Sequence, residues 1–260
     1  MPVESFNASV YLLDRQVEAC RGGHLAVTGP AGSLTYAELS QRVAELSSGL
    51  QALGVRPEER VLLVTSDRPE TVITFLALLR MGAVAVPVST MYNGTELGEL
   101  LRDTRARVVV ATGEFAAVTR EAMSLAPEAT TLVLAGEPGQ PGQTGQPGGP
   151  GQPGEPGPGG EAGTRSWADV LAEGQRAGPA APYGTWFDSP GFWLYTSGTT
   201  GTPKAAMHRH GSIARVCETY AHQVLGITPD DRCYSVAKLF FAYGMGNSLF
   251  FPFSVGATAV

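Results

Sequence analysis

The stretch FWLYTSGTTGTPK, residues 192–204, joins a predicted strand to a predicted ligand-binding loop. Its first four residues are apolar and predict a buried strand, whereas the small, hydroxylated residues that follow predict a loop leaving the end of that strand. Gly198 and Gly201 let the backbone approach a ligand closely, and backbone N–H groups in such a loop can surround an anion. Lys204 adds a positive charge directly after the loop. The combination indicates phosphate, with an ordinary surface turn as the alternative.

The Walker phosphate loop is the obvious rival motif, and its spacing differs from the one found here. That pattern is G-x-x-x-x-G-K followed by Ser or Thr. In this chain Thr202 and Pro203 separate Gly201 from Lys204, and Ala205 follows the lysine. Proline lacks an N–H group and disfavours helical geometry in the residue before it. We therefore expect no helix to open at this loop.

The first 135 residues alternate between predicted helices and predicted strands. A capping box at residues 35–38 begins a helix that Gly54 ends, and Pro69 begins another that Gly82 ends. Further helices are predicted at 95–103 and 116–125, and buried strands at 61–64, 83–88, 108–110 and 131–134. This alternation predicts an α/β fold of βαβ units, with mostly parallel sheets covered by helices.

A regular repeat interrupts this alternation, since glycine occupies every third position from Gly136 to Gly163, often with proline between. The composition is that of collagen, whose triple helix needs three chains with glycine at the crowded axis. The few apolar groups of this segment do not offset the entropy lost on ordering. A disordered linker inserted in a globular domain is therefore favoured over a trimer. On this interpretation, residues 137–162 are dispensable for folding.

A second informative stretch is AKLFFAYGMGN, residues 237–247. Aromatic residues beside glycines suit a flat apolar ligand, to which Tyr243 can offer a hydroxyl group. A corner of the hydrophobic core is the alternative. We expect a buried strand over 233–237 before it, a strand over 205–210 and a helix over 212–225. His208 and His210 would share a face of the strand over 205–210, but the nearby sequence offers no third metal ligand.

Composition excludes several classes of protein. The net charge is −6 and no basic cluster is present, which argues against nucleic acid as a partner. Hydrophobic residues make up 43 % of the chain, but no apolar run reaches the length of a membrane span. The N-terminus lacks a signal-peptide pattern, so we expect a cytoplasmic protein. Three widely spaced cysteines predict neither a disulfide framework nor a zinc site.

Residues 192–204 resemble, nearly residue for residue, the phosphate-binding signature of the adenylate-forming superfamily of acyl-CoA synthetases, luciferases and peptide-synthetase adenylation domains. LTYAEL (34–39) and LRMGAVAVPV (79–88) resemble the first and second core motifs of that family, in the same order. One difference is Ala205, where the family usually has glycine. We expect residues 1–135 and 164–260 to be parts of one AMP-binding domain that the insertion 136–163 interrupts.

Within that superfamily, residues 237–258 resemble the benzoate-CoA ligase branch, whose acyl pocket is lined at the positions matching Ala242, Tyr243 and Gly244. Cinnamate-activating relatives carry histidine where this chain has Phe241, so a benzoate-like acid is favoured. The resemblance implies that ATP converts the acid to an acyl-adenylate, from which coenzyme A takes the acyl group. It implies Lys204 as a catalytic residue and Thr196 as a ligand of Mg²⁺. The residues implied to hold the phosphates are Thr196, Ser197, Gly198, Thr199, Thr200, Gly201 and Lys204.

The resemblance covers only about half of the family's length. Later nucleotide-binding motifs, the acidic metal ligand, the hinge and the C-terminal domain with its adenylation lysine have no counterpart before residue 260, and the chain stops within a predicted strand at 257–260. We therefore expect a partial N-terminal portion that is inactive alone. The implied partner is a small aromatic carboxylic acid, not a membrane or nucleic acid. An inactive nucleotide- or acid-binding fragment is the alternative function.

Overall fold

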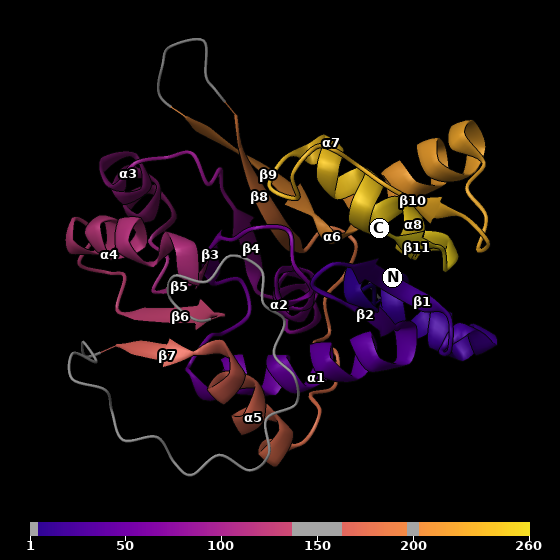
Figure 1. Ribbon diagram of the computed structural model, residues 1–260, viewed down its shortest axis with the longest axis horizontal. Coiled ribbons are helices and arrows are strands. Elements are labelled where there is room, and N and C mark those ends of the chain that lie inside the picture. The colour runs from indigo at the N-terminus through magenta and orange to yellow at the C-terminus, as the bar shows by residue number, and fades with distance from the viewer. Residues whose placement is uncertain (1–4, 137–162, 197–202) are drawn as a thin grey trace.

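The larger of two sheets carries the predicted parallel strands (Figure 1). The computed structural model describes residues 5–136, 163–196 and 203–260, and within these the sheet order is β7-β6-β5-β3-β4-β8-β9. Every neighbouring pair is parallel except β8 and β9. The predicted α/β fold with mostly parallel strands is confirmed. The strands are β3 (Arg60–Val64), β4 (Val84–Pro87), β5 (Val108–Thr112), β6 (Thr131–Ala135), β7 (Thr164–Ser166), β8 (Pro190–Thr196) and β9 (Lys204–Arg209).

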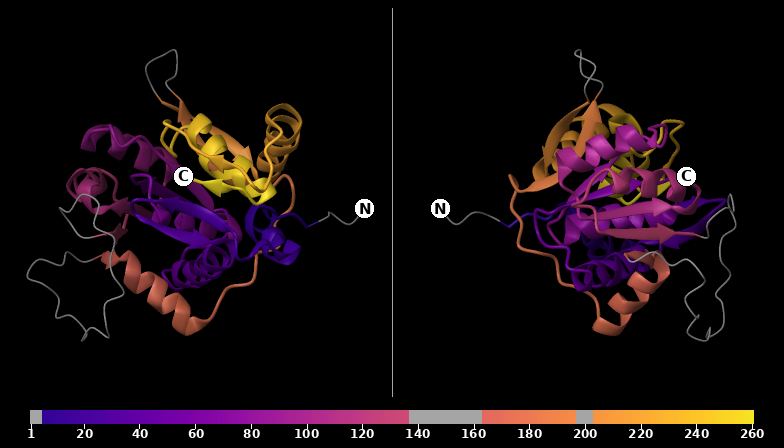
Figure 2. Two further views of the ribbon diagram at one scale, coloured as in Figure 1. Left: turned by 45° about the vertical axis from the view of Figure 1, so that its right-hand side comes forward. Right: turned by 90° about the vertical axis from the view of Figure 1, so that its left-hand side faces the viewer.

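Helices cover both faces of this sheet, which explains why its strands are continuously apolar. Side chains of a strand alternate between faces, so Val61 and Leu63 join one core while Leu62 and Val64 join the other. The first core packs under α1 (Tyr36–Ala52), α2 (Pro69–Arg80) and α5 (Trp167–Ala177). The second packs under α3 (Gly94–Thr104) and α4 (Ala116–Ser124). Figure 2 shows the sheet between these two helical layers.

The predicted helix boundaries have the expected chemical causes. Thr35 Oγ1 accepts a hydrogen bond from the N–H of Glu38 at 3.3 Å, and the Glu38 carboxylate accepts one from the N–H of Thr35 at 2.8 Å. Together they form the predicted capping box. Gly82 has a φ of +76°, the left-handed conformation that ends α2. Residues at the helix ends therefore determine where these two helices begin and end.

A second, four-stranded sheet joins distant parts of the chain. Its order is β10-β11-β1-β2, formed by β10 (Arg232–Cys233), β11 (Thr258–Ala259), β1 (Leu25–Gly29) and β2 (Gly32–Thr35). The sequence did not predict β1 or β2. The predicted buried strand over 233–237 is wrong, because only Cys233 belongs to a strand and Tyr234 and Val236 are 70 % and 82 % exposed. The partner strand β11 pairs with Arg232 and Cys233 alone, so the strand ends there.

Shorter helical segments complete the described chain. The helix predicted over 212–225 is present as α6 (His210–Val216) continued by the wider helical turn η4 (Cys217–Leu225). None of the helices among the described residues is both long and apolar enough to cross a bilayer. The other segments are η1 (Val10–Asp14), η2 (Val17–Arg21), η3 (Gly113–Phe115), α7 (Ala242–Met245), η5 (Gly246–Phe250) and α8 (Phe251–Val255).

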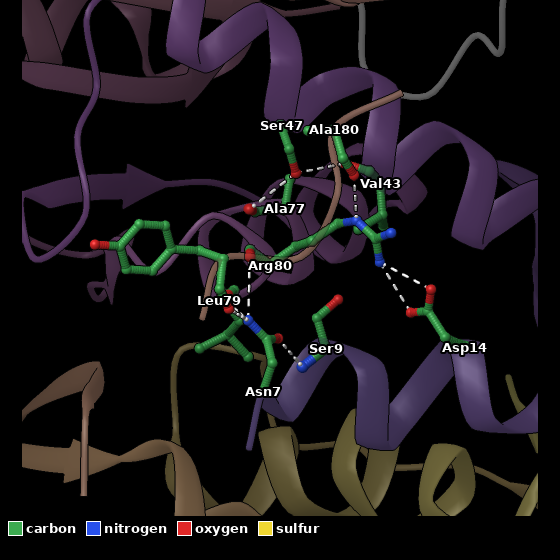
Figure 3. A network of polar contacts seen from close by, with 10 residues as sticks. Asn7, Ser9, Asp14, Val43, Ser47, Ala77, Leu79, Arg80 and Ala180 are labelled. Atoms are coloured by element: carbon green, nitrogen blue, oxygen red, sulfur yellow. Dashed lines mark hydrogen bonds and ion pairs between the residues drawn. The ribbon is translucent and has the colours of Figure 1, made fainter. Parts of the chain in front are cut away.

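A buried polar network holds the N-terminal segment against the end of α2 (Figure 3). The Arg80 guanidinium donates to both carboxylate oxygens of Asp14, at 3.0 and 2.9 Å, and to the carbonyl of Ala180 at 3.0 Å. Asn7 donates its amide to the carbonyls of Leu79 and Arg80, at 3.2 and 3.1 Å. The last turn of α2 thus obtains partners for its free carbonyls from a segment more than seventy residues away.

The glycine-rich insertion connects two neighbouring strands, β6 and β7. Residues 137–162 lie outside the described residues, so the linker interpretation stays a prediction. Leu132 pairs with Thr164 in parallel register, which places Gly136 and Gly163 at opposite ends of the strand pair, about 17 Å apart at 3.3 Å per residue. Direct joining of the two glycines is incompatible with this register. The predicted removal of residues 137–162 therefore requires a replacement linker of about five residues or more.

Candidate functional site

The candidate site lies where the parallel strands end. In open α/β sheets, ligands bind in the crevice outside the carboxyl ends of the strands. Thr196 is the last residue of β8, and Lys204 is the first residue of β9. The two are paired across the antiparallel hairpin, and Thr196 Oγ1 lies 3.4 Å from the Lys204 carbonyl oxygen, to which it donates. The hairpin therefore brings together the two ends of the predicted phosphate loop.

Both of these side chains are exposed. Among the described residues, no carboxylate forms an ion pair with Lys204. An ammonium group without a protein partner is suited to an anionic ligand at this edge. The loop residues Ser197, Gly198, Thr199, Thr200 and Gly201 lie outside the described residues, so their part in phosphate binding stays a prediction.

The aromatic segment packs over the ends of β3 and β4, of which β4 is the neighbour of β8 in the sheet. The N–H of Leu239 donates to Asp67 Oδ1 at 3.0 Å, and Lys238 Nζ lies 3.7 Å from Asp67 Oδ2. Asp67 follows β3, so these contacts fix residues 238 and 239 at the carboxyl edge of the sheet. Beneath them is an apolar cavity of about 10 Å³. Its lining consists of Leu63, Thr65, Thr71, Val72, Phe75, Pro87, Leu239, Phe240, Met245 and Leu249.

The predicted acyl-pocket residues form one turn of helix, α7. Ala242 and Tyr243 are exposed, Tyr243 by 70 %, and neither lines the small cavity, whereas Phe240 does. Gly244 is buried, and a Cβ atom there would lie 2.1 Å from the carbonyl oxygen of Lys238. The glycine is thus required for close backbone packing in this turn. The acid-binding role of the three residues stays a prediction.

Known proteins share this arrangement over nearly the whole chain. The sequence profile of the family described as AMP-binding enzyme matches residues 13–260. The chain belongs to the AMP-binding enzyme family. It is 38 % identical, over its full length, to a 4-hydroxybenzoate–CoA/benzoate–CoA ligase of Rhodopseudomonas palustris. It is 37 % identical over 258 residues, 99 % of the chain, to a benzoate–CoA ligase of Thauera aromatica. The chain spans 44 % of the length of each relative.

Solved structures of this family superpose on the chain as well. A benzoate CoA ligase from Burkholderia xenovorans LB400 matches with a TM-score of 0.79 and 33 % identity, over 98 % of this chain and 45 % of its own. The anthranilate CoA ligase AuaEII, solved in complex with anthranoyl-AMP, matches with a TM-score of 0.83 and 29 % identity. That match covers 100 % of this chain and 45 % of the other. The predicted membership of the adenylate-forming family is confirmed.

The AMP-binding family implies a magnesium ion, and the described residues offer it few ligands of their own. Mg²⁺ is commonly held by one or two protein oxygens together with phosphate oxygens and water. The exposed hydroxyl of Thr196 is one such oxygen. No group of three His, Cys, Asp or Glu side chains that could hold a metal occurs in the described part of the chain. The described residues therefore fit an ion that is coordinated mainly by phosphate oxygens and water, with the Thr196 hydroxyl as a candidate ligand.

The two histidines near the β8–β9 hairpin do not share a face of one strand, which corrects the expectation from sequence. His208 lies on β9 with its ring stacked on Phe192, with 4.6 Å between the ring centroids. His210 instead begins α6, because β9 ends at Arg209. It is fully buried, its Nδ1 accepts a hydrogen bond from the N–H of Ala8 at 3.0 Å, and burial lowers its pKa to about 4. His210 is therefore a neutral core residue.

Two residues of the site were missed by sequence reasoning. Asp67 holds the aromatic segment through residues 172 positions away in the chain. Tyr195 donates its hydroxyl to Asp103 Oδ2 at 2.5 Å, beside the phosphate loop. Burial, followed by the Asp103 carboxylate, raises the pKa of Tyr195, so its hydroxyl keeps the proton that it donates. Neither contact has a local sequence signal, because each joins a strand or loop to a distant element.

Proposed function

We propose that the full-length protein containing this chain is an AMP-forming ligase that activates benzoate-like aromatic acids with ATP and coenzyme A. The observation that carries the proposal is the Thr196–Lys204 pair at the carboxyl edge, next to strands whose ends lie under the aromatic segment. The names of the two relatives given above, both aryl acid–CoA ligases, support the class of substrate. We also propose that residues 136–163 are an insertion within one AMP-binding domain, since β7 after it pairs with β6 before it.

The proposed reaction has two steps. A carboxylate oxygen of the acid forms a bond to the α-phosphorus of ATP, and the bond to pyrophosphate breaks, which gives the acyl-adenylate. The thiol of coenzyme A then loses its proton as its sulfur bonds to the acyl carbon, and AMP leaves with the electron pair of the broken C–O bond. The first step brings two anions together, so catalysis depends on neutralising charge and aligning the reactants.

The described residues supply part of what the first step needs. The ammonium group of Lys204 has no carboxylate partner among residues 5–136, 163–196 and 203–260, so we expect it to offset phosphate charge. Thr196 would hold Mg²⁺ through its hydroxyl, and the ion, when bound, neutralises and orients phosphate oxygens. The loop residues between them would donate backbone N–H groups, as the sequence predicts.

For the acid, we propose that Ala242, Tyr243 and Gly244 border the site of the aromatic ring. The cavity of about 10 Å³ beneath Phe240 holds no more than a water molecule, so it is too small for a benzene ring. Binding of the ring in this cavity would therefore require its lining to rearrange, including Leu239, whose N–H is held by Asp67. An apolar pocket for the aromatic ring would discriminate between acids that differ by one methylene group by only about 1–3 kcal/mol.

Thioester formation by the full-length protein tests this proposal. The protein is incubated with ATP, Mg²⁺, coenzyme A and one acid from a panel of benzoate, 4-hydroxybenzoate, acetate and palmitate, and the products are identified by mass spectrometry. We expect benzoyl and hydroxybenzoyl thioesters to predominate. Tyr243→Ala should raise the KM for benzoate and accept bulkier acids while the KM for ATP stays nearly constant. Preference for acetate or palmitate would contradict the proposed substrate class.

A further inference from the structure

The end of β8, which carries Thr196, extends beyond the neighbouring strand β4. On the β4 side the pairing is limited to Ala85 with Phe192, and β4 ends at Pro87. On the β9 side the pairing continues to Thr196 and Lys204. Figure 1 shows β8 and β9 reaching past the other strands as a two-stranded arm. Because two strands alone are only marginally stable, the orientation of this arm depends on other contacts.

One side chain of the arm reaches the helical layer. Tyr195 packs against the core under α3 and α4, and its hydroxyl donates to Asp103 Oδ2 of α3 at 2.5 Å. A hydrogen bond to an ionised carboxylate is shorter and stronger than one between neutral groups. The last two residues of β8 are Tyr195 and Thr196. Among the side-chain hydrogen bonds of the described residues, only the one from Tyr195 to Asp103 links either of them to a helix. Thr196 follows Tyr195 directly, and Lys204 is paired with Thr196.

We propose that Tyr195 and Asp103 are positioning residues, and that their hydrogen bond sets the place of Thr196 and Lys204 relative to the sheet. A phenol suits this position because its ring is held by the apolar core while its hydroxyl reaches the carboxylate at the end of α3. The nucleotide-binding consequence rests on the proposed function. The orientation of the arm itself does not.

Steady-state ATP–pyrophosphate exchange in the full-length protein tests the nucleotide consequence. We expect Tyr195→Phe, which removes one hydroxyl, to raise the KM for ATP by roughly 5- to 10-fold, in line with the loss of one charge-assisted hydrogen bond at a partly exposed site. The KM for benzoate should stay within about twofold, because the aromatic segment is held by other contacts. Asp103→Ala should match Tyr195→Phe, and the double variant should be no worse than either. Tyr220→Phe, which removes a hydroxyl from a half-exposed ring on η4, is the matched control.

Hydrogen–deuterium exchange in the 260-residue chain tests the arm without any substrate. In Tyr195→Phe we expect faster exchange of the backbone amides of β8 and β9 and unchanged exchange in β3 and β5. Unchanged exchange in the arm, additive effects in the double variant, or equal increases in both KM values would overturn the positioning role. If hydrogen–deuterium exchange of the arm is faster in Tyr195→Phe but the full-length wild type shows no acid-dependent ATP–pyrophosphate exchange, the positioning of the arm stands and the proposed function fails.

Discussion

The buried side chain of His210 makes the stability of the chain depend on pH. The side chain is fully buried, and the cause of its lowered pKa, about 4 against an ordinary 6.5, is desolvation. A histidine that is harder to protonate in the folded state binds fewer protons there than in the unfolded state. Stability from this group is therefore complete above pH 6.5 and is lost as the pH falls from 6.5 to about 4.

The size of the effect follows from the same two values. A pKa that moves from 6.5 to about 4 corresponds to roughly 3 kcal/mol between the neutral and charged forms. That is a large fraction of the stability of an ordinary domain. The surroundings of the ring favour the neutral form of His210. Its Nδ1 already accepts a hydrogen bond from the N–H of Ala8, and its Nε2 has no partner among the described residues.

Urea unfolding at a series of pH values between 4 and 7 measures this contribution. His210→Asn keeps an acceptor for the Ala8 N–H group but does not titrate, so the stability difference between wild type and variant should shrink by about 3 kcal/mol from pH 7 to pH 4. His24→Asn, which makes the same substitution at an exposed histidine, is the control. A wild-type minus His210→Asn difference that is constant across this range would refute the reasoning.

Three further predictions concern packing, charge and connectivity. Gly244→Ala should lower the free energy of unfolding by about 1–3 kcal/mol in urea titrations, because its Cβ would lie 2.1 Å from a backbone oxygen; wild-type stability would refute this. Asp14→Ala should cost about 3 kcal/mol, since it leaves the buried guanidinium of Arg80 unpaired, whereas Asp188→Ala, which breaks an exposed pair, should cost less than about 1 kcal/mol; equal losses would contradict that account. Replacing residues 137–162 by about eight glycine and serine residues should preserve the melting temperature, and direct joining should lower it; a stable directly joined variant would contradict the β6–β7 register.

Local patterns predicted the parts of the fold whose causes are local. The apolar run at 61–64 became β3, and the capping box at residues 35–38 became the start of α1. β11 lies within the strand predicted at 257–260. β1 and β2 escaped prediction because β1 is half-exposed and its pairing with β11 joins Val27 to Ala259, residues with no pattern that links them. The strand expected over 233–237 failed for a related reason, since an apolar composition does not supply a neighbouring strand.

The candidate site divides in the same way. The strand before the phosphate loop and the lysine after it were read from adjacent residues, and β8 and β9 place them together. Asp67 and Tyr195 depend on contacts across 172 and 92 positions, which a single sequence does not encode as a pattern. The prediction of an aromatic wall did not distinguish inward-facing from exposed side chains. Phe240 lines the cavity, whereas Phe241 and Tyr243 are exposed.

The proposed function assigns Lys204, beside Thr196, to phosphate chemistry on an aromatic acid. Benzoate-dependent exchange of labelled pyrophosphate into ATP by the full-length protein tests it most directly, with Lys204→Ala compared with Lys204→Arg. Because the ammonium charge is matched to phosphate, we expect exchange in wild type, at least about 10-fold weaker exchange in Lys204→Ala at limiting ATP, and partial recovery in Lys204→Arg. Exchange that does not depend on benzoate, or that is equal in Lys204→Ala and wild type, would contradict the account.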